Sequence, residues 1–287
     1  LFHYSRPCTL TIFYVHLAFM HTYAFFTLLM PIILTNTNLI ILHQNTQEVS
    51  NKRDRLQHLA EQVKPNVLIL TEHGLKKDQL ENTIIIPGYS LMAYFCRTEH
   101  RGGGVAIYVE ENLKKHTEEI DVHQFCEELT LEAALVKIRY GKSNLHILGT
   151  YRPPNGNFNV ALEILSDIIT STKTDNYPLV IMGDINVDIL SPDRKNVLLD
   201  ETLATHNIKR LQLPATRITP LTKSSIDWIC TNINIEKITP KVIHAGLSDH
   251  TAQSCSVNFS KIQSNPPRMG RCLRRKNLQE LKCLLGE

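Results

Sequence analysis

The sequence of 287 residues predicts an α+β sandwich, in which β-sheets pack face to face and helices cover their outer sides. Short apolar runs typical of strands recur along the chain, whereas few segments space their apolar residues as a helix does. Polar residues able to carry chemistry follow several of these runs, where turns end the strands. A hydrophobic content of 43% is sufficient for a full core at this length.

A strand–helix–strand unit opens the regular part of the chain. The spacing of apolar residues predicts a strand, a helix and a second strand, in this order, at residues 39–42, 51–63 and 67–70. Pro65 ends the helix. Such a unit brings the ends of both strands to one edge of a sheet. Asn45 and Glu72, which follow the two strands, are therefore expected at that edge together.

Further strands and two helices are expected after this unit. Apolar runs occupy residues 105–109, 131–138, 145–150, 179–182, 226–230 and 253–259, and helical spacing is found at residues 160–169 and 196–206. A glycine stops the run at 179–182, so Asp184 and Asn186 follow a buried strand and can point into one cleft. Tyr151 begins a loop that two prolines stiffen.

Two short strings, Gly183–Asn186 and Ser248–His250, carry residue types that suit phosphodiester hydrolysis. The first combines a carboxylate with an amide. The second pairs a carboxylate, which is a ligand for hard metal ions, with an imidazole, the side chain whose unperturbed pKa lies near neutrality. Together these groups suit the attack of water on a phosphodiester that a hard divalent cation holds.

The composition argues against several kinds of cofactor site. The chain has neither a glycine-rich P-loop nor a G-x-G-x-x-G string, so no nucleotide cofactor is indicated. Its 7 cysteines are scattered without a C-x-x-C pair, which predicts reduced thiols rather than a zinc site or a disulfide framework. A net charge of +3 permits a nucleic-acid partner without requiring one.

The two ends of the chain differ in composition from the part between them. Residues 10–34 are nearly all apolar, and we interpret residues 1–36 as a segment outside the domain, with a membrane anchor or a signal peptide as alternatives. Residues 37–260 are expected to form the domain. Residues 261–287 contain clustered arginines and are predicted to be a solvated basic linker, with a phosphate-binding arm as the alternative.

A series of motifs runs through residues 39–260. The motifs are Gln44–Asn45, Leu70–His73, Gly102–Tyr108, Tyr151–Pro154, Gly183–Asn186, Thr216–Arg217, Ser225–Trp228 and Ser248–His250. In this order they resemble those of the endonuclease/exonuclease/phosphatase superfamily, and more closely the apurinic-type endonuclease domain of non-LTR (LINE-type) retrotransposons. The Tyr-Arg-Pro-Pro and Gly-Gly-Gly-Val-Ala strings are similar to the retrotransposon branch in particular.

The resemblance implies a four-layer α/β sandwich of two mixed β-sheets flanked by helices, as in DNase I. It also implies an endonuclease that uses Mg²⁺, or Mn²⁺, to nick target DNA and leaves a 3′-hydroxyl for target-primed reverse transcription. The reverse transcriptase domain of the parent element would follow the basic linker, and the protein would act in the nucleus. A membrane location is expected only if residues 10–34 are a genuine anchor.

The same resemblance assigns roles to residues of the motifs. Glu72 and Asn45 would bind the cation, with Asp249 supporting the metal side or orienting the cluster. Asp184 and Asn186 would position or deprotonate the attacking water and hold a phosphate oxygen. Whether the base is this aspartate or the histidine of the last motif stays open.

Five further residues complete the expected site. His250 would contact the scissile phosphate or share the proton of the water, and Asp227 would accept a hydrogen bond from its ring and fix its tautomer. Tyr151 would contact the phosphate in the transition state. Arg152 and Arg217 are candidate contacts to DNA phosphates.

Gln47 is a departure from the pattern. Many relatives have an Asp at this position, so one carboxylate of the metal side is absent and a lower metal affinity is expected. Two alternative functions stay open: a phosphodiesterase of phospholipids or inositol phosphates with the same fold, and an inactive, domesticated DNA-binding module. The string Ser225–Trp228 lacks the Cys-Asp-Arg of inositol phosphatases, and the intact acidic and histidine residues argue against an inactive site.

Overall fold

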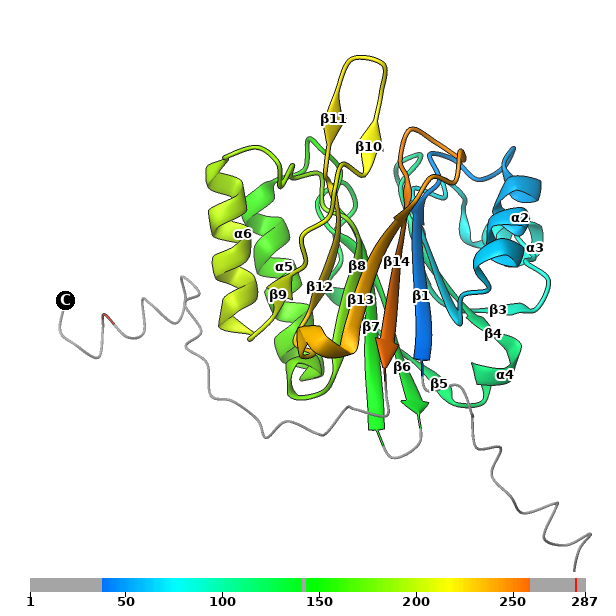
Figure 1. Cartoon of the computed structure of the whole chain (residues 1–287), viewed down its shortest axis with the longest axis horizontal. Coiled ribbons are helices and arrows are strands. Elements are labelled where there is room, and N and C mark those ends of the chain that lie inside the picture. Colours follow the sequence, from blue (N-terminus) through cyan, green and yellow to red (C-terminus); the bar gives the residue numbers. More distant parts are fainter. Residues whose placement is uncertain (1–37, 141–142, 259–281, 283–287) are drawn as a thin grey trace, which may run out of the picture. The chain divides into compact units, whose positions relative to one another are not determined.

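The computed structural model describes residues 38–140, 143–258 and 282 (Figure 1). The expected apolar segment 1–36 lies outside the described residues, and so does the expected basic linker 261–287 apart from Lys282. Within the described ranges, no helix is both long enough and apolar enough to cross a membrane.

Two six-stranded sheets face each other, and helices cover the outer side of each (Figure 1). The first sheet has the order β13-β14-β1-β2-β4-β3 and contains β1 (Asn38–Asn45), β2 (Val67–Thr71), β3 (Tyr89–Phe95), β4 (Val105–Glu110), β13 (Ile238–Ile243) and β14 (Ala252–Asn258). The second has the order β5-β6-β7-β8-β12-β9 and contains β5 (Thr117–Ile120), β6 (Glu132–Tyr140), β7 (Ser143–Tyr151), β8 (Leu179–Asp184), β9 (Lys209–Arg210) and β12 (Asp227–Thr231). Both sheets mix parallel and antiparallel pairs, which confirms the predicted four-layer α/β sandwich.

The helices pack on the sheets through apolar faces. Their bounds are α2 (Arg53–Val63), α3 (Lys77–Thr83), α4 (Glu111–Lys114), α5 (Phe158–Thr172) and α6 (Arg194–Thr205), with short 3₁₀ helices at His123–Phe125, Thr174–Asn176 and Ile235–Lys237. Leu56 and Leu59 of α2 share a buried cluster with Leu68 of β2. Leu165 of α5 lies in the corresponding cluster of the second sheet. The apolar spacing that predicts α2 and α5 is therefore explained by their contact with the sheets.

The first strand–helix–strand unit forms as predicted. β1 and β2 are parallel neighbours, with Asn45 opposite Thr71 at the last pair of the ladder. Every residue of β2 is buried, since one face packs on helices and the other faces the second sheet. The sheets approach closely at Gly149 of β7, where a Cβ would lie 2.9 Å from Ile69 Cγ2. Close packing of the two sheets thus fixes the ends of their strands relative to one another.

Three strands of the second sheet bring polar residues into a row. β7 and β8 are parallel, with Tyr151 opposite Asp184, and β8 and β12 are antiparallel, with Asp184 opposite Asp227. Gly183 permits this arrangement, because a Cβ on it would lie 1.8 Å from the carbonyl oxygen of Thr150. The register therefore places three side chains of the second sheet at one end of the sandwich.

Several elements lie outside the sequence prediction, among them β3, β5, β9, β13, α3, α4 and the hairpin β10 (Arg217–Ile218) and β11 (Lys223–Ser224). Four of these strands, β3, β5, β9 and β13, form sheet edges and carry a mixed pattern of partly exposed residues. Pro240 within β13 is typical of an edge strand. A search for continuous apolar runs misses such strands because only one side of them is covered.

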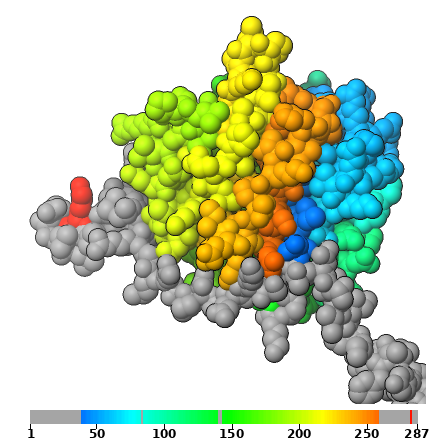
Figure 2. Space-filling model, viewed as in Figure 1, coloured from blue at the N-terminus to red at the C-terminus, as the bar shows by residue number. Residues whose placement is uncertain are grey.

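The hairpin of β10 and β11 protrudes beyond the ends of the sheets (Figures 1 and 2). Leu221 at its tip is 94% exposed. Arg217 at its base forms an isolated bridge with His250, which ties the hairpin to the segment before β14. The hairpin consequently stands beside the end of the sandwich at which the predicted site residues gather.

Candidate active site

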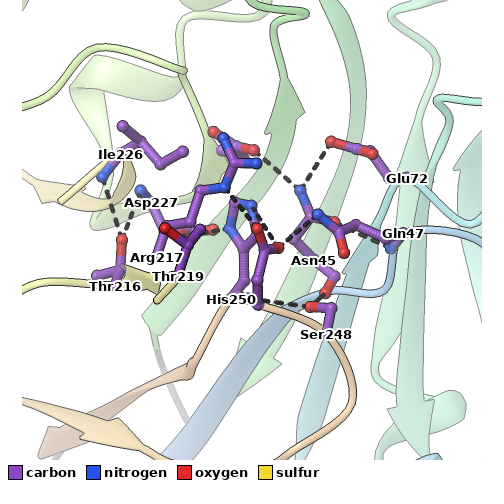
Figure 3. Close-up of polar contacts among 12 residues, drawn as sticks. Asn45, Gln47, Glu72, Thr216, Arg217, Thr219, Ile226, Asp227, Ser248 and His250 are labelled. Carbon is purple, nitrogen blue, oxygen red and sulfur yellow. Dashed lines mark hydrogen bonds and ion pairs between the residues drawn. The ribbon is translucent and has the colours of Figure 1, made fainter. Parts of the chain in front are cut away.

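The predicted site residues gather where strands of both sheets end (Figure 3). Asn45 ends β1 and Glu72 follows β2, so these two come from the first sheet. Asp184 ends β8 and Asp227 begins β12 in the second sheet. His250 lies just before β14. The structure therefore brings these strand ends together, and their joint role in one catalytic site stays a prediction.

The amide of Asn45 connects the two sheets. Its Nδ2 donates hydrogen bonds of 2.9 Å to Glu72 Oε1 and 2.9 Å to Asp184 Oδ2. Its Oδ1 accepts from the backbone N–H of Gln47 at 3.0 Å. Asn45 is fully buried and therefore orients both carboxylates; its predicted role as a direct metal ligand stays a prediction.

Two of the site residues have a left-handed backbone. Glu72 has φ +51° and Asn186 has φ +51°, which non-glycine residues adopt only at a cost in strain. The N–H of Glu72 donates to the carbonyl of Gly104 at 3.0 Å, and the N–H of Asn186 donates to Asp184 Oδ1 at 2.9 Å. These hydrogen bonds hold the sharp turns that aim the side chains after the strands.

His250 and Asp227 form the predicted pair. His250 Nδ1 lies 2.9 Å from Asp227 Oδ2, and since a carboxylate can only accept, Nδ1 donates. His250 Nε2 lies 3.8 Å from Asp249 Oδ1 and is not engaged by the pair. Asp227 is further held by the hydroxyl of Thr216, which accepts from its backbone N–H at 3.0 Å.

The buried charges of the cluster affect one another. Burial and the charge of Asp227 raise the pKa of Asp184 above its ordinary value. Burial acts to lower the pKa of His250, but its hydrogen bond to Asp227 and the charges of the neighbouring aspartates raise that pKa overall. The cluster thus concentrates negative charge at a buried place and draws protons or cations to it.

A hard divalent cation fits this donor set. Asp184, Asp227 and His250 each offer a ligand atom, and these atoms lie within 4.8 Å of one another. Within the described part of the chain, Asp227 Oδ1 is buried and has no hydrogen-bond partner. Carboxylate oxygens are the ligands that Mg²⁺ and Mn²⁺ prefer, and the half-buried Glu72 adds one on the solvent side.

Gln47 and Arg217 hold Asp249 from two sides. Gln47 Nε2 donates to Asp249 Oδ1 at 2.5 Å, and Arg217 Nε donates to Asp249 Oδ2 at 2.8 Å. Partial burial acts to raise the pKa of Asp249, but these hydrogen bonds and the charge of His250 lower it below its ordinary value. An aspartate at position 47 would repel Asp249, whereas the amide of Gln47 donates a hydrogen bond to it. Gln47 thus binds the carboxylate that was expected to support the metal.

The structure corrects the expectation for Arg152. Its side chain is only 1% exposed, and its guanidinium donates to the backbone carbonyls of Ile185, Gly156 and Asn186. The carbonyl of Arg152 in turn accepts from Asn186 Nδ2 at 2.8 Å. Arg152 therefore braces the turn after β8 and is not placed to contact DNA, because buried backbone carbonyls take up its donors.

Tyr151 lies in the site but is largely buried. It is 5% exposed, and its hydroxyl lies near the carboxylate of Glu72. Burial and then the charges of Glu72 and Asp184 raise the pKa of Tyr151 well above its ordinary value. The phenol is therefore neutral at physiological pH and can donate a hydrogen bond.

Sequence reasoning missed several residues that support the site. His43 lies behind the pair, with Nδ1 2.6 Å from Gln253 Oε1 and 3.8 Å from Asp227 Oδ1. Glu132 is a fully buried carboxylate in the apolar strand β6. A charged residue within a buried run is a signal that could have indicated Glu132, whereas no local pattern indicates His43.

Comparisons with known proteins agree with this fold. Residues 36–250 match the model of the Endonuclease/Exonuclease/phosphatase family. The endonuclease domain of TRAS1, a telomere-specific non-LTR retrotransposon, is similar with TM-score 0.62 and 17% identity over 78% of this chain and 100% of that one. The AP endonuclease LMAP of Leishmania major is similar with TM-score 0.61 and 14% identity, covering 77% of this chain and 88% of that one.

A further similar structure is that of D. rerio TDP2 complexed with a single-strand DNA product, with TM-score 0.54 and 14% identity over 78% of this chain and 100% of that one. No curated protein sequence matches this chain significantly. At these identities the structures show a shared fold, while the family model covers most of the described domain. The chain belongs to the endonuclease/exonuclease/phosphatase family.

Proposed function

We propose that this protein is a divalent-metal-dependent DNA endonuclease that nicks one strand and leaves a 3′-hydroxyl end. Members of this family are hydrolytic nucleases and phosphodiesterases. The observation that carries the proposal is the bridge from Asn45 to Glu72 and Asp184, which joins a metal-side carboxylate to the buried Asp184–Asp227–His250 cluster. Metal-assisted attack of water on a phosphodiester needs these two parts side by side.

Glu72 would hold the cation together with oxygens of the substrate and water, as sparse Mg²⁺ sites in proteins do. When bound, the cation supplies Lewis-acid stabilisation of the phosphate and of the leaving oxygen. Asp249 would support it less directly, because Gln47 and Arg217 already engage both of its oxygens.

The chain's own groups can assist each part of the reaction. Asp184 would accept a proton from the attacking water as the new P–O bond forms and the bond to O3′ breaks, and the leaving O3′ would take a proton from solvent water to give the 3′-hydroxyl. Protonated His250, whose pKa burial acts to lower but the neighbouring aspartates raise overall, would donate from Nε2 to a phosphate oxygen, since Asp227 accepts from its Nδ1. The neutral hydroxyl of Tyr151 would donate to the same phosphate as negative charge develops.

The substrate proposed is target DNA of a non-LTR retrotransposon, with the 3′-hydroxyl priming reverse transcription in the nucleus. The motif series and the similarity to the TRAS1 endonuclease domain support this assignment. Arg217, at the base of the hairpin, has a partly exposed side chain and is a candidate contact to the DNA backbone. The reverse transcriptase domain of the parent element is the proposed partner.

A plasmid assay tests the function. Supercoiled DNA should be converted to the nicked form in the presence of Mg²⁺ or Mn²⁺ and not in EDTA. A DNA polymerase should extend the nicks directly, which shows 3′-hydroxyl ends. Parallel incubations with sphingomyelin and inositol phosphates should release no product. Hydrolysis of these small substrates without nicking would contradict the assignment in favour of a phospholipid or inositol phosphate enzyme.

A further inference from the structure

The glycine motif Gly102–Gly104 makes room for buried side chains. All of its residues have positive φ, between +65° and +91°. A Cβ on Gly103 would lie 2.4 Å from Arg97 Cζ, and a Cβ on Gly104 would lie 2.3 Å from His73 Nε2. A Cβ on Gly102 would meet nothing within 4 Å. The motif therefore accommodates a buried arginine at one particular position.

Arg97 is anchored within the protein. Its side chain is 6% exposed, and its Nε donates to Glu132 Oε1 at 2.5 Å. Its Nη1 donates to the carbonyl of Arg101 at 2.9 Å. Glu132 is 0% exposed, and its second oxygen accepts from the N–H of Gly104 at 2.6 Å. The ion pair is thus held by hydrogen bonds on both sides, which fixes the guanidinium plane.

The anchored guanidinium lies against Tyr151. Arg97 Cζ is 5.9 Å from the centre of the Tyr151 ring. The register of β6 and β7 places Glu132 directly opposite Tyr151, so the carboxylate that holds the arginine belongs to the neighbouring strand. At the far end of the ring, the hydroxyl lies near the carboxylate of Glu72. Glu132, Arg97, Tyr151 and Glu72 are therefore successive neighbours, from the interior of the sandwich to the site.

We infer that Arg97 is a positioning residue: held by Glu132 and by the space at Gly103, it fixes the Tyr151 ring so that the hydroxyl faces the scissile phosphate. This inference rests on the proposed function. A guanidinium within about 6 Å of a ring centre is attracted to the face of the ring, and because Arg97 is itself anchored, this attraction resists movement of the ring. A side chain that is misplaced by about 1 Å can lower a rate by on the order of 100-fold, so such support matters for a group that acts in the transition state.

A double-mutant cycle separates positioning from simple structural support. Arg97→Met should lower kcat for plasmid nicking by on the order of 10- to 100-fold with little change in KM. Arg97→Lys, which keeps the charge but not the plane, should fall between. In a Tyr151→Phe background, which lacks the hydroxyl, Arg97→Met should cause no further loss. An equal loss in both backgrounds, or wild-type kcat in folded Arg97→Met, would overturn the inference.

Two glycine variants form a matched pair that leaves Arg97 itself in place. Gly102→Ala and Gly103→Ala impose similar strain at φ +73° and φ +65°, but only the second methyl group collides with the Arg97 guanidinium. Gly103→Ala should therefore lower kcat in the way Arg97→Met does, and Gly102→Ala should not. Equal kcat values for the two variants would contradict the inference even if Arg97→Met fails to fold.

A spectroscopic readout does not depend on nicking. In protein labelled with 3-fluorotyrosine, the ¹⁹F resonance of Tyr151 can be assigned by its loss in Tyr151→Phe. It should shift in Arg97→Met and in Gly103→Ala but not in Gly102→Ala. A resonance unmoved in all three variants would refute contact between Arg97 and the ring. If the wild-type protein does not nick DNA and the shift is still observed, the proposed function fails while the positioning contact stands.

Discussion

At the scale of single residues, the site depends on buried polar atoms whose hydrogen-bond partners are fixed by the fold. Asn45 uses both hydrogens of its amide for carboxylates that belong to opposite sheets. His250 uses Nδ1 for Asp227, which leaves Nε2 as its reactive atom. Because these groups are buried, an unpaired polar atom would be costly, and the hydrogen bonds therefore fix the side-chain orientations before any substrate binds.

Removing either the proposed base or the imidazole that donates to the phosphate should strongly reduce nicking. His250→Ala and Asp184→Ala are each expected to lower kcat by on the order of 10²- to 10⁴-fold, and the double variant should be little worse, since residues that act together in one transition state do not contribute additively. Asp227→Asn should be milder than His250→Ala if Asp227 only orients the ring. Nicking rates under single-turnover conditions measure this, and fully additive losses would refute a shared step.

Glu72 should determine the requirement for metal. Glu72→Gln removes a charged ligand and keeps the proposed base, so the Mg²⁺ concentration for half-maximal nicking should rise by on the order of 10- to 100-fold, with activity recovering at high Mg²⁺. Glu48→Gln, a nearby exposed carboxylate, is the control and should leave the requirement unchanged. A loss of activity that no concentration of Mg²⁺ restores would assign Glu72 to the chemistry rather than to the metal.

At the scale of elements, the site is made by the ends of strands. The ladder of β7, β8 and β12 sets Tyr151, Asp184 and Asp227 side by side, whereas the residues that follow β1 and β2 come from the facing sheet. The turns after β2 and β8 use left-handed residues, Glu72 and Asn186. Strand register thus sets the distances between the site side chains, and the strained turns set the directions in which those side chains point.

The second sheet also contains a histidine that should make stability depend on pH. His146 of β7 is 3% exposed, and its Nδ1 has no hydrogen-bond partner in the described part of the chain. Burial, and then the charge of Lys137, lower the pKa of His146 to about 4. The centre of its ring lies 5.2 Å from the centre of the Tyr177 ring, and this packing leaves little space for water to solvate a charged imidazole.

The direction of the effect follows from linkage. Between the ordinary pKa of histidine and the folded value of about 4, the unfolded chain binds a proton that the folded chain does not, so the free energy of unfolding falls as the pH falls through this window. The loss from His146 should reach up to about 3 kcal/mol near pH 4. Urea unfolding at pH 7.5 and near pH 4 measures it. His146→Leu should weaken the pH dependence and His58→Gln, an exposed control, should not; an unchanged dependence in His146→Leu would contradict the prediction.

At the scale of the whole molecule, the residues that match the family and the buried clusters lie within one continuous stretch. The family model covers residues 36–250, and the buried clusters on the two outer faces of the sheets include residues from Leu42 to Ala252. β14, which ends at Asn258, pairs with β1, so the beginning and the end of the domain are neighbours in one sheet. Backbone hydrogen bonds between β1 and β14 therefore hold the first and last strands of the domain together.

A protein comprising residues 37–260 should therefore fold by itself and nick DNA with Mg²⁺. It should give one cooperative unfolding transition, and its rate of nicking should match that of the full chain. Circular dichroism during urea unfolding and the plasmid assay test both statements. If this protein is insoluble and residues 1–36 restore solubility and activity, the apolar segment is part of the domain and the proposed boundary is wrong.

The sequence by itself determined the sandwich and the chemistry that its strand ends carry. Apolar period and turn residues are local signals, so the strands ending near Asn45, Glu72 and Asp184 could be predicted without coordinates. The edge strands β3, β5 and β13 could not, because their pattern depends on which side a neighbour covers.

Only the tertiary structure decided which atoms meet. Asn45 and Asp184 are 139 positions apart, and Gln47 and Asp249 are 202 positions apart, so no local pattern could indicate that they share hydrogen bonds. The burial of Arg152 and the contact of Arg97 with Tyr151 likewise follow from the packing of two sheets whose strands come from distant segments. Residue type limits what a side chain can do, but its partners are set by register and by the fit between the sheets.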